Sequence, residues 1–110
     1  MPSATAIVDA GAITDRPSFH RECAKVFGFP DFYGENMNAW IDCLTCLPEG
    51  DGMSAFILGA DGRLFIEVVG FESFMRRVPE VCSALLECTA FVNLRYVERG
   101  DVPRLAIVPR

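Results

Sequence analysis

Residues 28–47 read GFPDFYGENMNAWIDCLTCL and join a turn rich in Gly, Pro and aromatic side chains to a helical pattern. Gly and Pro set special backbone conformations, so the first half of the stretch is predicted to be a shaped loop. Asn36 can cap a helix because its side-chain oxygen accepts an early backbone N–H. From Met37 onward the apolar residues recur at helical spacing, which predicts a helix over residues 37–47 with one buried face.

The opposite face of this predicted helix is polar. It carries Asn38, Asp42 and Thr45, and it follows the aromatic pair Phe32 and Tyr33 of the loop. Most acidic residues in mid-helix are solvated surface groups. Asp42 differs in its setting, because it lies near an aromatic loop on a face otherwise short of charge. We interpret this surface as a protein-binding face that presents an anion to a cationic pocket.

The rest of the chain alternates short apolar runs with helical patterns. The predicted strands are residues 4–9, 64–69 and 105–108, and the predicted helices are one capped by Thr14 or Asp15 and ended by Gly28, residues 37–47, residues 71–77 and a long helix from Pro79 to Gly100. Strands separated by helices imply a small, mainly parallel sheet with right-handed crossovers. The fold class is therefore α/β, with the first strand expected to be buried on both faces.

Two assignments stay open. Residues 54–58 and 64–69 flank a Gly-rich turn, which predicts a hairpin and would add a fourth strand to the expected three. Residues 92–96 alternate as a strand would, but the helical period is sustained from Val81, so a helix is preferred.

Composition limits the classes of protein to consider. The 110 residues imply one domain over residues 1–110, and a hydrophobic content of 51% suffices for a packed core. No window reaches the roughly 18 apolar residues of a membrane span, and no signal peptide is visible, so we expect a cytoplasmic protein that does not enter a membrane. The net charge of −5 argues against direct binding of nucleic acid and suits a basic protein partner.

The five Cys residues and the single His give little sign of catalysis. An odd number of Cys suggests reduced thiols rather than a disulfide framework. Cys43 and Cys46 form a C-x-x-C pair, but they fall in the C-terminal half of a helix, where the helix dipole disfavours a thiolate. A zinc site is the alternative, and it would need Cys82 and Cys88 as two more ligands. His20 is expected on the surface of the first helix rather than in a catalytic site.

Residues 33–36 read YGEN and residues 42–45 read DCLT, with Ala39 between them. Pro30 precedes this run, and the Phe-His pair of residues 19–20 lies in the first predicted helix. This spacing resembles the barstar family, the intracellular inhibitors of barnase-type ribonucleases. The resemblance implies a three-stranded parallel sheet with helices packed around it.

The resemblance also implies a mechanism, in which the loop and helix of residues 30–47 plug the active site of a ribonuclease. Asp42 matches a carboxylate that takes the place of the substrate phosphate, and Phe32 matches a loop aromatic that stacks in the nuclease cleft. The implied partner is a basic extracellular-type ribonuclease or a related toxin, and the protein is implied to be an inhibitor without enzymatic activity, cofactor or metal. The matched partner-binding positions are Phe32, Gly34, Asn36, Met37, Asn38, Ile41, Asp42, Cys46 and Leu47.

The chain also departs from the family pattern. Asn38 stands where the well-studied inhibitor carries a second acid. A count back from Gly100 puts Arg95 where another acid is expected, and a shift at the end of the helix leaves Glu98 as the alternative. Residues 50–62 resemble an insertion relative to short family members. The reduced acidity favours a ribonuclease with a charge layout unlike that of barnase, or alternatively a regulatory binding module for a non-nuclease protein.

Overall fold

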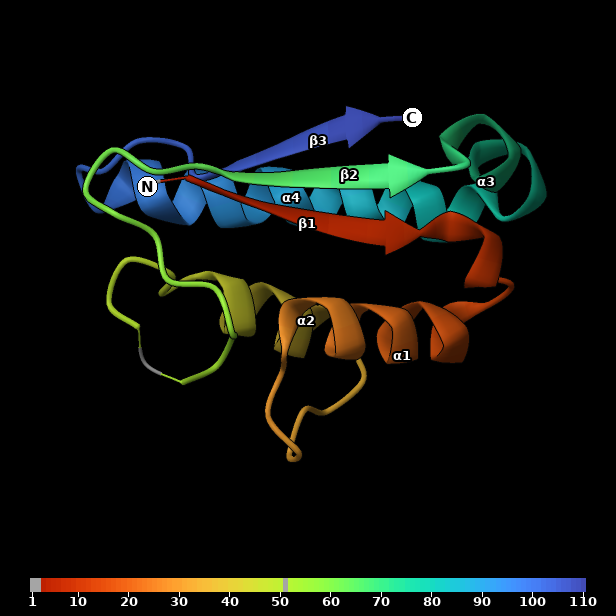
Figure 1. Cartoon of the computed structure of the whole chain (residues 1–110), viewed down its shortest axis with the longest axis horizontal. Helices are drawn as coiled ribbons and strands as arrows, with labels where there is room; N and C mark the ends of the chain where they lie inside the picture. The colour runs from red at the N-terminus through yellow and green to blue at the C-terminus, as the bar shows by residue number, and fades with distance from the viewer. Residues whose placement is uncertain (1–2, 51) are drawn as a thin grey trace.

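The structure is a computed structural model that describes residues 3–50 and 52–110. In chain order its elements are β1 (Ala4–Asp9), the 3-10 turn η1 (Ala10–Ala12), α1 (Arg16–Phe27), α2 (Met37–Leu44), β2 (Leu64–Val69), α3 (Phe71–Arg77), α4 (Pro79–Glu98) and β3 (Leu105–Pro109). Figure 1 shows the strands side by side, with α4 running along the sheet and α1 and α2 below β1 in the view. The predicted α/β class is confirmed.

The three strands form one parallel sheet in the order β1-β2-β3. Ala6 of β1 pairs with Ile66 of β2, which pairs with Ile107 of β3. Burial alternates along β1 and β2, so that Ala6 and Ile66 face the core while Ile7 and Phe65 are exposed. The expectation that the first strand is buried on both faces is therefore wrong, because the helices cover only one face of this sheet.

The predicted hairpin is also wrong, because residues 54–58 do not pair with β2. Their backbone N–H groups donate instead to carbonyls at the end of α1 and beyond the end of α2. The N–H of Ala55 donates to the carbonyl of Phe27 at 2.8 Å, and the N–H of Leu58 donates to the carbonyl of Leu47 at 3.2 Å. Backbone donors satisfied in this way are not available for a strand ladder. The described sheet accordingly keeps three strands.

Helix α2 ends at Leu44, earlier than the predicted end at residue 47. One cause is local, since Pro48 disfavours helical backbone at the residue before it. The other cause is tertiary, since the hydroxyl of Tyr96 on α4 donates to the carbonyl of Leu44 at 2.6 Å. A side chain from a distant helix therefore takes a carbonyl at the end of α2.

The ends of α1 follow the sequence signals. Asp15 caps the helix, with its carboxylate accepting from the N–H of Ser18 at 2.9 Å. Gly28 ends it in the left-handed region at φ 67°, and a Cβ there would lie 2.6 Å from the Cβ of Ala55. Only glycine fits both the backbone angle and this close approach. The helical assignment of residues 92–96, which lie within α4, is confirmed.

The buried hydrophobic side chains of the described residues form one core cluster between the sheet and the helices. Trp40 is fully buried in this cluster, with its ring edge-on to Phe27 at a centroid distance of 6.1 Å. The largest fully buried side chains include Trp40, Tyr96, Phe19, Phe27 and Phe74. No helix among the described residues is long and apolar enough to cross a membrane.

Candidate functional site

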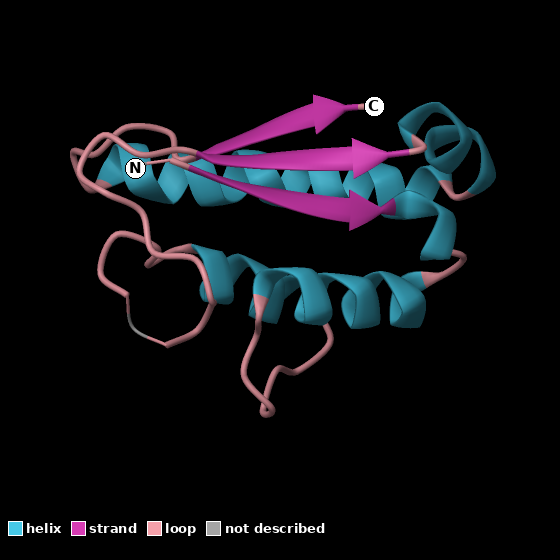
Figure 2. Ribbon diagram, in the orientation of Figure 1, coloured by secondary structure: helices cyan, strands magenta, loops and turns pink. Residues whose placement is uncertain are grey.

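The loop between α1 and α2 projects away from the sheet (Figure 2). In Figure 1 the same loop is drawn in orange tones. Its base is aromatic, with the rings of Phe29 and Tyr33 only 4.6 Å apart between centroids. The N–H of Tyr33 donates to the carbonyl of Pro30 at 2.9 Å, which closes a tight turn. Phe32 lies within that turn, and 75% of its surface is exposed. The loop thus presents one large aromatic ring on an ordered base.

His20 anchors this loop to α1. Its Nδ1 shares a hydrogen bond of 2.5 Å with the hydroxyl of Tyr33. His20 is only 3% exposed, so the expectation of a surface histidine is wrong. The loop covers the ring, which helical spacing alone could not reveal. Desolvation by this burial lowers the pKa of His20, while the negative charge of Glu35 opposes the shift.

Asn36 organises the start of α2. Its side-chain oxygen accepts from the N–H of Ala39 at 2.8 Å, which confirms the predicted cap. Its amide nitrogen donates back to the carbonyl of Gly34 at 3.2 Å. Glu35 between them adopts a left-handed backbone with φ 52°, a conformation that is uncommon outside glycine. These bonds fix the direction in which the loop enters the helix.

Asp42 points from α2 toward α4 and meets Arg95 there. The Nη1 of Arg95 lies 2.8 Å from the Oδ1 of Asp42 and 3.4 Å from the hydroxyl oxygen of Thr45. The carboxylate remains 62% exposed and the guanidinium side chain 41% exposed. Of the two α4 residues that the sequence left open, Arg95 is therefore the one beside Asp42.

A second arginine, Arg99 directly after α4, binds the end of α2. The Nη2 of Arg99 donates to the carbonyl of Thr45 at 2.6 Å, and its Nη1 lies 4.0 Å from a carboxylate oxygen of Glu49. The guanidinium also lies over the ring of Tyr96, 4.8 Å from the centroid. The contacts of Arg99 could not be predicted from local sequence patterns, because they join segments far apart in the chain.

Tyr96 connects the same two elements from inside. Besides donating to Leu44, its hydroxyl accepts from the N–H of Leu47 at 3.0 Å. Burial raises the pKa of Tyr96 to about 12, so the hydroxyl keeps its proton and its role as donor at neutral pH. The end of α2 is thus held by the buried side chain of Tyr96 on α4 and by the exposed side chain of Arg99 directly after it.

The predicted contact residues fall into three groups. Phe32, Gly34, Asn36, Asn38 and Asp42 are exposed, and Met37 and Cys46 are half-buried. Ile41 and Leu47 are 8% and 2% exposed, so their side chains belong to the core and the free surface does not present them. The exposed group lies along the loop and the polar face of α2, and we refer to these five residues together with Arg95 as the α2 face.

The cysteine side chains in the described part of the chain do not form a metal site. Within the described residues the five cysteines form no disulfide bond, and Cys23, Cys43, Cys82 and Cys88 are buried. Within residues 3–50 and 52–110, no group of three or more His, Cys, Asp or Glu side chains could hold a metal ion. Desolvation by burial raises the pKa of Cys23 to about 12, which makes this thiol unreactive. The zinc alternative has no geometric support in this part of the chain.

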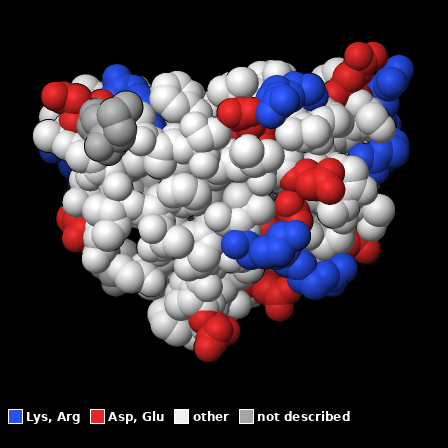
Figure 3. All heavy atoms as spheres, viewed as in Figure 1, with Lys and Arg blue, Asp and Glu red and all other residues white. Residues whose placement is uncertain are grey.

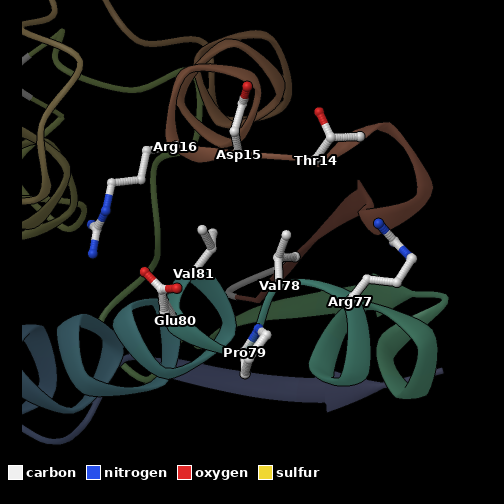
Figure 4. Close-up of a pocket in the computed structure, with 8 residues that line it drawn as sticks. All are labelled: Thr14, Asp15, Arg16, Arg77, Val78, Pro79, Glu80 and Val81. Atoms are coloured by element: carbon white, nitrogen blue, oxygen red, sulfur yellow. The ribbon is translucent and has the colours of Figure 1, made fainter.

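A hollow lies between the start of α1 and the junction of α3 with α4 (Figure 4). Asp15 lines it but points away, because its carboxylate caps α1. Arg77 lines it from the other side and donates to the carbonyls of Ala10 and Ile13, each at 3.1 Å. Asp15 and Arg77 are therefore occupied by hydrogen bonds within the fold.

On the face shown in Figure 3, acidic and basic side chains lie among one another. Figure 3 shows basic and acidic side chains interspersed over the right half of the face in view, whereas the middle of the left half is largely without them. The net charge of −5 therefore does not form one acidic patch on that face. On the α2 face, the acid Asp42 is directly paired with the base Arg95.

Comparison with known proteins gives one result that spans almost the whole chain. The model of the family described as Barstar (barnase inhibitor) matches residues 3–108. A search of curated proteins found no match. The three-stranded parallel sheet agrees with the fold implied by the resemblance of the YGEN and DCLT segments. The chain belongs to the barstar (barnase inhibitor) family.

Proposed function

We propose that this protein is an intracellular inhibitor of a barnase-like ribonuclease and blocks the active site with the loop and helix of residues 30–47. Membership of the barstar family supports a ribonuclease as the class of partner. The observation that carries the proposal is the exposed carboxylate of Asp42, held on α2 beside a loop that exposes Phe32. Residues 1–110 would act as one domain, as a stoichiometric binding protein rather than an enzyme.

Asp42 would take the place of the substrate phosphate. A ribonuclease binds phosphate with cationic side chains, and a carboxylate offers the same charge and the same kind of acceptor oxygens. Closing the interface removes water from the pair, which strengthens it. Truncating one partner of such a pair costs about 2–5 kcal/mol or more, and coupling energies of close charge pairs in the barnase–barstar complex itself are about 1.5–7 kcal/mol.

The internal pair with Arg95 does not prevent this use of Asp42. Both side chains are largely open to solvent, and a surface ion pair of this kind contributes only about 0–1 kcal/mol. That energy is smaller than the gain from a desolvated pair at the interface. Asp42 can therefore exchange its internal partner for cations of the ribonuclease.

The loop would contribute to the affinity for the ribonuclease because it is already ordered before binding. Phe32 can stack in an active-site cleft, because an exposed aromatic ring buries much apolar area when it is covered. Tyr33 is fixed by His20 and Asn36 caps α2, so little backbone freedom remains to be lost on binding. Binding an ordered loop costs less conformational entropy than binding a flexible one.

The test is a binding and cleavage screen against barnase-type ribonucleases. Wild-type protein should abolish RNA cleavage at equimolar amounts, and Asp42→Asn should weaken binding by about 30-fold or more, which corresponds to about 2 kcal/mol. Glu72→Gln is the matched control, because Glu72 is an exposed carboxylate on α3 that also pairs with an arginine. Equal affinity of the wild type and Asp42→Asn for a ribonuclease would refute the proposed role.

A second candidate is a barstar-fold binding module for a protein that is not a nuclease. Asn38 in place of a second acid and the pairing of Asp42 with Arg95 favour it, because both reduce the mimicry of phosphate. A pulldown that recovers a non-nuclease protein through the α2 face, abolished by Phe32→Ala, would support this candidate. Displacement of the captured protein by a ribonuclease would instead support the first candidate, inhibition of a ribonuclease.

A further inference from the structure

Arg95 offers hydrogen-bond donors outward from the α2 face. In the described part of the chain its side-chain hydrogen bonds to Asp42 and Thr45 both come from Nη1. The N–H groups of Nε and Nη2 have no protein acceptor there, and the side chain is substantially exposed. A guanidinium carries five N–H donors in a plane and fits a carboxylate through two parallel bonds. The unused donors of Arg95 are therefore suited to an anionic group on a partner.

Arg99 does not compete for this role. Its Nη2 is bound to the carbonyl of Thr45, and its guanidinium is stacked on the ring of Tyr96. Arg95 is the arginine that lies directly beside the carboxylate of Asp42, at 2.8 Å. The α2 face thus presents an anion and a cation side by side.

This arrangement restricts the partner by charge. A pocket that holds only cations would pair with Asp42 but would repel Arg95 once water is excluded. Such like-charge contacts select against the wrong partner. The pocket that fits has cations opposite Asp42 and a carboxylate opposite Arg95, within a few ångströms of each other.

A ribonuclease active site can meet both conditions through its chemistry. Its cations bind the phosphate and stabilise the charge that develops there. Its general base removes the proton from the neighbouring ribose hydroxyl, and a Glu or Asp can serve as that base. The two groups act on adjacent atoms of one nucleotide, so they must be close together.

We infer that Arg95 is a specificity residue of the α2 face, and that the fitting partner is a ribonuclease with a carboxylate general base beside its phosphate-binding cations. This inference rests on the proposed inhibitor function. Asp42 occupies the phosphate position, while Arg95 leaves Asp42 and donates to the carboxylate base. The inhibitor then satisfies the catalytic acid–base group as well as the phosphate site.

A double-mutant cycle tests the inference. Its readout is the binding affinity measured by calorimetry, so it does not depend on the enzymatic activity of the ribonuclease. The probe is the barnase-type ribonuclease that binds in the screen above, in one form with its carboxylate base and in another with the amide in its place. Arg95→Ala should weaken binding to the carboxylate form by about tenfold or more, and binding to the amide form by less than about threefold. Arg95→Lys keeps the charge without the planar fork, so it should lose affinity for the carboxylate form to an intermediate extent.

Arg76→Ala is the control, because Arg76 is an exposed arginine on α3 that pairs with Glu72. It should change neither affinity. Equal effects of Arg95→Ala on both forms of the ribonuclease, or tighter binding to both, would overturn the inference. If Asp42→Asn still weakens binding in that case, the proposed function stands and only the role of Arg95 fails. If the wild type binds no ribonuclease, both fail.

Discussion

Replacing Tyr96 with Phe removes a hydroxyl that joins the interior of α4 to the end of α2. The side chain is fully buried, and its hydroxyl donates to the carbonyl of Leu44 at 2.6 Å and accepts from the N–H of Leu47 at 3.0 Å. Phe keeps the ring, so little cavity is created. The change instead leaves a buried carbonyl and a buried N–H without their partner, and each such group costs about 1–3 kcal/mol.

We therefore expect Tyr96→Phe to lower the free energy of unfolding by about 2–6 kcal/mol, the sum for the two groups. Urea denaturation should show a lower midpoint with an unchanged slope, since the surface exposed on unfolding stays the same. The melting temperature should fall by roughly 4 °C for each kcal/mol lost. Ser83→Ala is the control, because Ser83 is an exposed hydroxyl residue on the same helix and its loss should change stability by less than about 0.5 kcal/mol. A loss below about 1 kcal/mol for Tyr96→Phe would refute the claim that its hydroxyl holds α2 in place.

Further predictions concern the ends of α1 and the chemistry near the loop. Gly28→Ala should destabilise the protein by at least about 2 kcal/mol, because the residue has φ 67° and a Cβ would lie 2.6 Å from the nearest carbon. Gly70→Ala is the control, because Gly70 has φ 80° but open space around it, and it should cost about 1 kcal/mol in the same urea titration. Burial lowers the pKa of His20 in the folded state, so the unfolded chain binds the proton first and stability should fall as the pH drops through about 6.5, by at most about 1.4 kcal/mol per pH unit. In thermal melts between about pH 7.5 and 5.5, His20→Gln should flatten that dependence, and an unchanged slope would exclude His20 as its source. Half-buried Cys46 should be alkylated at about pH 8, whereas buried Cys23, with a pKa raised to about 12, should not. A bound ribonuclease should protect Cys46 from alkylation. Equal labelling of Cys46 with and without the ribonuclease would place the interface elsewhere.

The fold was largely predictable because its signals are local. Helix ends at Asp15 and Gly28 follow from side-chain caps and a left-handed glycine, and the start of α2 follows from Asn36. The parallel sheet follows from strands separated by helices. These features depend on neighbours in sequence, so periodicity and cap chemistry suffice to find them.

The missed features depend on packing between distant segments. Residues 54–58 look like a strand, but their N–H groups are taken by the carbonyls that end α1 and follow α2. Arg104 gives a second case, because this buried side chain donates to the carbonyls of Gly59, Ala60 and Gly62. Neither contact leaves a mark in the local pattern of residues.

The candidate site shows the same division. The exposed aromatic loop and the polar face of α2 could be predicted from residues 28–47 alone. The contact of Asp42 with Arg95 could not, because it depends on how α2 packs against α4. The burial of His20 was missed for a related reason, since the loop that covers it belongs to another segment. This packing changes the α2 face from a lone anion to an ion pair.

Competition with a nucleotide tests the central claim, occupation of a ribonuclease active site, most directly. The apparent Kd of the protein for the ribonuclease would be measured by calorimetry at increasing concentrations of a non-cleavable nucleotide that fills the phosphate site. If Asp42 takes the phosphate position, the two ligands exclude each other, and the apparent Kd should rise in proportion to nucleotide concentration once the nucleotide site is saturated. An apparent Kd that does not change with nucleotide would place the protein outside the active site and contradict the account.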